Sequence, residues 1–192
     1  ADETKKGAFE LAPHQLFVKN YLSYQTPYNS LLLYHQLGTG KTCSAIGICE
    51  EMREYMREVG VTKRIMIIAS PNVQDNFRLQ LFDDRKLKDV NGLWTMEGCI
   101  GNSFIKEINP TNMAGISREK IVSQIQNLIN RYYVFMGYEK FSKYINRVSQ
   151  EGSGIELTKA QIVNNLRREF SSRLIVIDEV HNMRISEENP EI

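Results

Sequence analysis

The segment His35-Gln36-Leu37-Gly38-Thr39-Gly40-Lys41-Thr42 decides the fold expected of this chain. It follows an apolar run over 31–34 and opens a helical pattern that continues to about Val59. A glycine-rich turn between a strand and a helix directs several backbone N–H groups to one point, where the helix N-terminus adds partial positive charge. The segment is therefore predicted to bind the phosphates of a nucleoside triphosphate. Lys41 would reach the β- and γ-phosphates, and the Thr42 hydroxyl would take a place on Mg²⁺.

The first position of this phosphate loop departs from the general pattern GxxxxGK[ST], because His35 stands where a glycine is usual. The remaining positions, Gln36, Leu37, Gly38, Thr39 and Gly40, are expected to supply the backbone cradle. The alternative is a glycine-rich turn that binds nothing. A buried strand before the loop and a helix after it favour the phosphate site.

Apolar runs alternate with helical periodicities along most of the chain. Buried strands are predicted at 30–35, 64–69, 132–136 and 174–177, with short strands at 92–96 and 103–108. Helices are predicted at 13–22, 41–59, 74–82, 117–131, 140–148 and 157–170. Strands that are apolar throughout are typical of a parallel sheet covered on both faces. The pattern predicts an α/β domain over 1–192 with a mainly parallel sheet flanked by helices.

The helical periods also predict which faces are buried. Leu16, Phe17 and Tyr21 form the apolar side of the first helix, whereas Glu50 and Arg53 are expected to face solvent in the second.

Composition and charge narrow the functional classes. The 192 residues carry a formal net charge of +1, so any basic patch for nucleic acid must be local. No apolar run is long enough to span a membrane. The cysteines, Cys43, Cys49 and Cys99, are odd in number and lack metal-ligand spacing, so free, buried thiols in a reducing compartment are expected.

A second chemical element follows the last predicted strand, where the chain reads Asp178-Glu179-Val180-His181. Ligand sites of open α/β sheets lie at the carboxyl ends of the strands, the edge that is also expected to carry the phosphate loop. Asp178 would hold Mg²⁺, and Glu179 would orient and activate the attacking water. The alternative is a solvated acidic strand end.

These two motifs together resemble the first RecA-like domain of superfamily 2 helicases and translocases, of the DEAH or DExH type. The resemblance implies ATP with Mg²⁺, nucleic acid as partner, and a γ-phosphate-sensing role for His181. Leu11-Ala12-Pro13-His14-Gln15 resembles the glutamine motif, which implies that Gln15 recognises adenine; a helical glutamine without a ligand is the alternative. Ser70, Pro71 and Asn72 resemble the motif that contacts the nucleic-acid backbone.

The resemblance extends to the segment Met136-Gly137-Tyr138-Glu139, which is similar to the Thr-Tyr-Glu segment of Swi/Snf-type translocases. It implies a nucleic-acid contact for Tyr138, although Gly137 lacks the hydroxyl of the usual threonine. The stretches 26–35 and 176–184 are similar to helicases of the nucleocytoplasmic large DNA viruses, including poxvirus nucleoside triphosphatase I and early transcription factor ATPases.

We therefore expect a viral ATPase that moves on nucleic acid, DNA rather than RNA, in transcription or genome processing. A virion or host-cytoplasm location would suit that role. A nucleotide-gated assembly module, a small P-loop kinase and an AAA+ switch remain alternatives. The chain starts at Ala1 and ends at Ile192 after a polar stretch, so we expect a fragment of a two-domain protein. Its arginine finger would come from the second RecA-like domain, so the isolated piece should hydrolyse little ATP.

Overall fold

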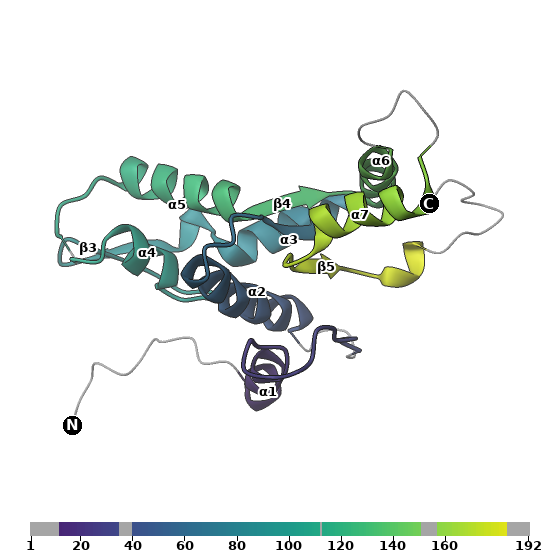
Figure 1. Ribbon diagram of the computed structural model, residues 1–192. Helices are drawn as coiled ribbons and strands as arrows, with labels where there is room; N and C mark the ends of the chain where they lie inside the picture. The colour runs from purple at the N-terminus through teal and green to yellow at the C-terminus, as the bar shows by residue number, and fades with distance from the viewer. Residues whose placement is uncertain (1–11, 35–39, 112, 151–156, 184–192) are drawn as a thin grey trace. The chain divides into compact units, whose positions relative to one another are not determined.

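The computed structural model describes residues 12–34, 40–111, 113–150 and 157–183. The phosphate-loop residues His35, Gln36, Leu37, Gly38 and Thr39 lie outside these ranges. The helices are α1 (Pro13–Tyr21), α2 (Lys41–Glu58), α3 (Pro71–Leu81), α4 (Ser103–Ile108), α5 (Arg118–Tyr132), α6 (Tyr138–Ser149) and α7 (Lys159–Phe170) (Figure 1). The strands are β1 (Ile65–Ile68), β2 (Leu87–Val90), β3 (Leu93–Met96), β4 (Tyr133–Met136) and β5 (Ile175–Ile177). Two short 3₁₀ turns lie at Asp84–Lys86 and Val180–Met183.

The chain divides into two compact units. The first is built from 1–62 and 75–132, and the second from 63–74 and 133–192. Among the described residues, no helix is long and apolar enough to cross a membrane.

The second unit is a three-stranded sheet in the order β4-β1-β5, and both strand pairs are parallel. Central Ile67 lies opposite Phe135 on one side and Val176 on the other. Every residue of β1 is buried, so its side chains are covered on both faces of the sheet. Helices α6 and α7 lie side by side (Figure 1) and meet through an edge-on contact between Phe141 and Phe170. This arrangement confirms the predicted α/β class with a parallel sheet and is consistent with a RecA-like fold.

The strand predicted at 30–35 is wrong for its described part. Residues 30–34 have no regular structure, and Leu32 and Tyr34 are 76% and 91% exposed. An apolar run favours burial, but a strand also needs a neighbour to satisfy its backbone hydrogen bonds. In the described ranges, both neighbours of β1 in the sheet are other strands, β4 and β5.

The region 83–116 of the first unit differs from the prediction at two points. The strand expected at 92–96 is confirmed as β3, which forms an antiparallel hairpin with β2, a strand that the sequence pattern missed. The positive φ angles of Asn91 and Gly92 suit the tight turn between them. The strand predicted at 103–108 is wrong, because α4 occupies it and buries Phe104 and Ile105. Six residues are too few to separate helical from strand periodicity.

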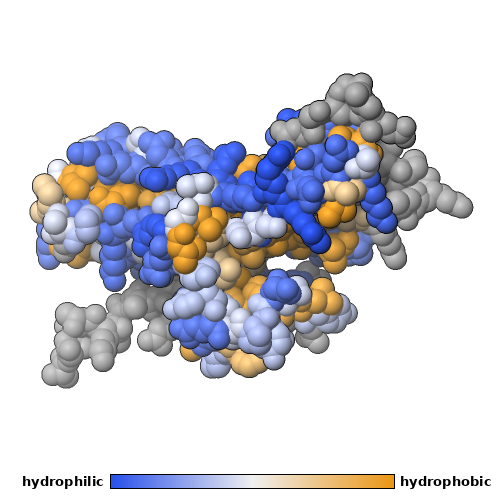
Figure 2. All heavy atoms as spheres, in the orientation of Figure 1, coloured by the Kyte–Doolittle hydropathy of each residue, from blue (hydrophilic) through white to orange (hydrophobic). Residues whose placement is uncertain are grey.

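The predicted faces of the first two helices also need correction. In α1, Gln15 and Val18 are buried, while Leu16 and Phe17 remain largely exposed, and Figure 2 shows hydrophobic patches among polar residues on the surface of this helix. Gln15 and Val18 are three positions apart and therefore lie on the same face of α1, the face in contact with α2. The polar Gln15 is thus part of the contact between the two helices. In α2, Glu50 and Arg53 are buried rather than solvent-facing.

The cysteine prediction is wrong for two of the three residues. Cys43 on α2 and Cys99, which precedes α4, form a disulfide with their Cα atoms 5.2 Å apart. Only folding brings these residues together, because 56 positions separate them in the sequence. Cys49 is free and buried, as predicted. Burial, and secondly the Glu50 carboxylate, raises the pKa of its thiol.

Candidate functional site

The described end of the phosphate loop forms the start of α2. Gly40 is the N-cap, with φ 76° and ψ 30°, a left-handed conformation that glycine adopts without steric cost. Lys41 and Thr42 are the first two helical residues, and both are half-buried. The backbone N–H groups of the first turn and the dipole of an 18-residue helix therefore converge where these two side chains begin. This geometry at the described end of the loop suits phosphate binding, which stays a prediction.

Gln15 is held against that loop. Its Nε2 donates to the carbonyl of Gly40 at 3.2 Å, and its Oε1 accepts from the backbone N–H of Ala12 at 2.9 Å. The residue is 7% exposed. A Cβ atom at Gly40 would lie only 2.5 Å from Gln15 Nε2, so the Gln15 side chain would have to shift, and the positive φ also disfavours a side chain at this position. The structure thus places Gln15 on the loop backbone, and its contact with adenine stays a prediction.

In the second unit, three strand ends place predicted site residues along one edge of the sheet. Because β4, β1 and β5 are parallel, their carboxyl ends share this edge. Ser70, Pro71 and Asn72 follow β1, Tyr138 follows β4, and Asp178 follows β5. The residues predicted to contact nucleic acid and the predicted catalytic acids are therefore neighbours on the sheet.

Hydrogen bonds between neighbouring strands continue for one residue beyond the ends of β1 and β5. The backbone N–H of Ala69 donates to Met136 O at 3.1 Å, and that of Asp178 donates to Ile68 O at 2.9 Å. Gln74, which the sequence pattern did not identify, donates its side-chain amide to Ala69 O at 2.7 Å. These contacts hold the backbone of the three loops close to the sheet.

The acidic pair sits in an unusual local conformation. Glu179 has φ 45°, in the left-handed region that a residue with a Cβ rarely adopts. Its carboxylate lies 3.2 Å from Nδ1 of His181, and both side chains are more than half exposed. Tyr138 Oη donates to the backbone carbonyl of Asp178 at 2.8 Å. Non-glycine residues in such conformations concentrate at functional sites.

The predicted Mg²⁺ ligands are Thr42 and Asp178. Among the described residues, no group of three His, Cys, Asp or Glu side chains could hold a metal by itself. Magnesium that arrives with nucleotide phosphates needs only one or two protein oxygens. A hydroxyl in the first turn of α2 and a carboxyl at a strand end suit that ligand chemistry, and their roles remain proposals.

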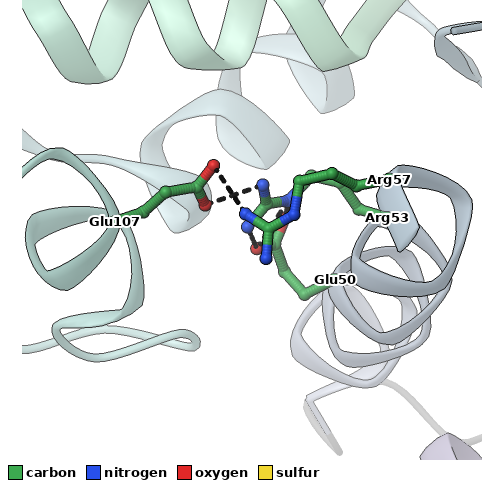
Figure 3. Close-up of polar contacts among 4 residues, drawn as sticks. All are labelled: Glu50, Arg53, Arg57 and Glu107. Atoms are coloured by element: carbon green, nitrogen blue, oxygen red, sulfur yellow. Dashed lines mark hydrogen bonds and ion pairs between the residues drawn. The ribbon is translucent and has the colours of Figure 1, made fainter. Parts of the chain in front are cut away.

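A largely buried ionic cluster joins α2, the helix that follows the phosphate loop, to α4. Arg53 is 1% exposed and binds both oxygens of Glu50, while its NH1 lies 2.8 Å from Glu107 on α4 (Figure 3). Arg57 NH1 joins the same Glu107 at 3.1 Å. Burial alone would lower the pKa of Arg53, but the two carboxylates raise it above its ordinary value. The guanidinium also lies over the rings of Phe104 and Tyr132, at 5.3 and 4.9 Å.

No protein-family model matches this chain, and no solved structure matches it significantly. Several curated proteins do match its sequence. A protein of Acanthamoeba polyphaga mimivirus named "Putative ATP-dependent RNA helicase" is 31% identical over 176 residues, which are 91% of this chain and 25% of that protein. The chain is a homologue of viral helicase-like proteins. The resemblance predicted from its two nucleotide motifs is thereby confirmed.

Other relatives of this viral helicase homologue point the same way. A "Putative helicase" of Frog virus 3 is 28% identical over 89% of the chain and 15% of its own length. An early transcription factor large subunit homolog of African swine fever virus is 42% identical over 56 residues, 29% of the chain and 5% of its own length. The chain thus spans a quarter or less of these relatives.

Proposed function

We propose that this viral helicase homologue is the ATP-binding, RecA-like part of a nucleic-acid-dependent ATPase that couples hydrolysis to movement on DNA or RNA. The observation that carries the proposal is the shared sheet edge, where Asp178 and Glu179 lie beside the strand ends that carry Ser70 and Tyr138. Binding of a polymer at that edge could then act directly on the acids. The names of the mimivirus relatives support ATP as the nucleotide.

The roles follow from the chemistry of each group. The loop backbone from Gln36 to Gly40 and the Lys41 ammonium would bind the phosphates, and Thr42 and Asp178 would hold Mg²⁺. Magnesium, when bound, neutralises charge on the phosphates. Glu179 would orient the attacking water, and His181, paired with Glu179, would report the state of the phosphate to the polymer site.

The proposal is tested with the full-length protein by steady-state ATP hydrolysis with no polymer, single-stranded DNA, duplex DNA or single-stranded RNA. We expect one of these polymers to stimulate ATP turnover, and that polymer is the nucleic acid on which the protein moves. The sequence analysis favours DNA. Lys41→Ala should abolish ATP binding. Glu179→Gln should bind ATP but lose turnover by roughly 10²-fold or more. Glu97→Gln, which alters an exposed ion pair with Lys88, is the matched control. Full turnover by E179Q would overturn the proposal.

A second candidate is a nucleotide-gated assembly module of a transcription complex. The local 42% identity to the early transcription factor subunit homolog supports it. In that case ATP would change binding of the full-length protein to viral transcription proteins, and no polymer would stimulate turnover. A nucleotide-dependent pull-down alongside the hydrolysis assay separates the two functions.

A further inference from the structure

The peptide between Asp178 and Glu179 is where β5 leaves the sheet. The N–H of Asp178 makes the last bond to β1, at 2.9 Å from Ile68 O, and its carbonyl accepts the Tyr138 hydroxyl at 2.8 Å. That carbonyl and the N–H of Glu179 belong to one rigid peptide plane. Whatever fixes the carbonyl therefore fixes the plane that enters Glu179.

The orientation of this plane sets the conformation of the predicted catalytic base. Rotating it changes ψ of Asp178 and φ of Glu179 together, and Glu179 has the disfavoured φ of 45°. A residue with a Cβ leaves such a conformation unless neighbouring contacts hold it. The Tyr138 hydroxyl is one such contact, and the turn bond from Asn182 N–H to Glu179 O, at 2.9 Å, is another.

Tyr138 is well placed to act as a fixed support. It is the first residue of α6, and its half-buried ring packs against the core formed by Met66, Ile68, Met136 and Phe141. The ring is therefore positioned by the sheet and not by the loop that it supports. A hydroxyl anchored in this way can hold Glu179 in place before substrate arrives.

We infer that Tyr138 is a positioning residue for Glu179, acting through the carbonyl of Asp178. The inference rests on the proposed function, in which Glu179 orients the attacking water. It assigns the hydroxyl of Tyr138 to the hydrolytic step, whereas the family resemblance implied a contact with nucleic acid.

The test uses full-length protein carrying Tyr138→Phe, which keeps the ring and removes the donor. Polymer-stimulated kcat should fall roughly 10- to 100-fold, because a small displacement of a base has effects of this size. The KM for ATP and for the polymer should not change. The matched control is Tyr144→Phe, the same substitution on the same helix, whose hydroxyl instead donates to Glu169 on α7.

Glu179→Gln separates the outcomes. If Tyr138 acts through Glu179, the double variant Y138F/E179Q should be no slower than E179Q alone. If E179Q is inactive while Y138F matches Y144F, the inference about Tyr138 is overturned and the proposed function stands. A raised polymer KM with unchanged kcat would instead make Tyr138 a nucleic-acid contact, and a kcat loss explained by a lower unfolding temperature would make it structural. Full activity of E179Q would remove the proposed function itself.

Discussion

The buried amide of Gln15 donates to the carbonyl of Gly40, which joins α1 to the first turn of the phosphate-loop helix. Ser44 donates two further hydrogen bonds to the same carbonyl, from its backbone N–H at 3.0 Å and from its hydroxyl at 3.3 Å. The conformation of the loop end is thus determined by residues from two helices.

Gly40→Ala tests this relationship directly. An alanine at position 40 would have to adopt a positive φ, which costs about 1–2 kcal/mol. Its Cβ would also displace the Gln15 side chain, and the lost hydrogen bond costs about 1 kcal/mol. Gly60→Ala is the control, since Gly60 has a similar φ of 75° but nothing within 4 Å of an added Cβ. We expect G40A alone to weaken ATP binding. Equal effects of both substitutions on ATP affinity and unfolding would show that the contact with Gln15 is unimportant.

Arg53→Met should destabilise the first unit by about 3–5 kcal/mol, because it removes the guanidinium that is ion-paired with the buried Glu50 carboxylate. Arg57→Met removes an ion pair to the same Glu107 from a side chain that is 48% exposed, and should cost less than about 1 kcal/mol. Urea denaturation followed by circular dichroism measures both. Similar midpoints for the two variants would contradict a structural role for the buried cluster.

The disulfide predicts a definite thiol count. Without reductant, the denatured 192-residue chain should expose one titratable thiol, that of Cys49, and after reduction three. The folded protein should resist alkylation near neutral pH, because burial protects Cys49 and raises the pKa of its thiol. Cys43→Ser should lower stability by roughly 2–4 kcal/mol in non-reducing buffer only. Three thiols in this 192-residue chain, freshly purified and unreduced, would contradict the pairing.

The contact between α6 and α7 should weaken in acid. Burial acts to raise the pKa of Glu169, but hydrogen bonds and charge from Tyr144 and Arg173 lower it below its ordinary value. A lowered carboxyl pKa stabilises the fold above the unfolded-state value, and this contribution is lost as pH falls, here below about pH 4.5. Glu169→Gln should therefore be less stable than wild type at pH 7 and lose less stability between about pH 5 and pH 3. Parallel stability curves for the two proteins would refute this.

Much of the fold could be predicted from periodicity. The helices starting near Pro13, Lys41 and Arg118 and the three strands of the parallel sheet lie close to their predicted positions. Long amphipathic or fully apolar runs have few alternative structures. The predictions failed where a segment was short, as at 103–108, or where the partner decided the outcome, as at 30–34 and for Arg53.

By itself, the sequence determined the α/β class and predicted the chemistry proposed for the candidate site, because phosphate-loop and acidic motifs are recognised by residue type and spacing. Tertiary structure alone decided which polar side chains are buried and what they bind. The contacts of Gln15 with Gly40, Tyr138 with Asp178, and Arg53 with Glu107 join positions 25, 40 and 54 residues apart. Such pairs leave no local pattern, since the energy of a buried hydrogen bond or ion pair depends on the neighbour that folding supplies.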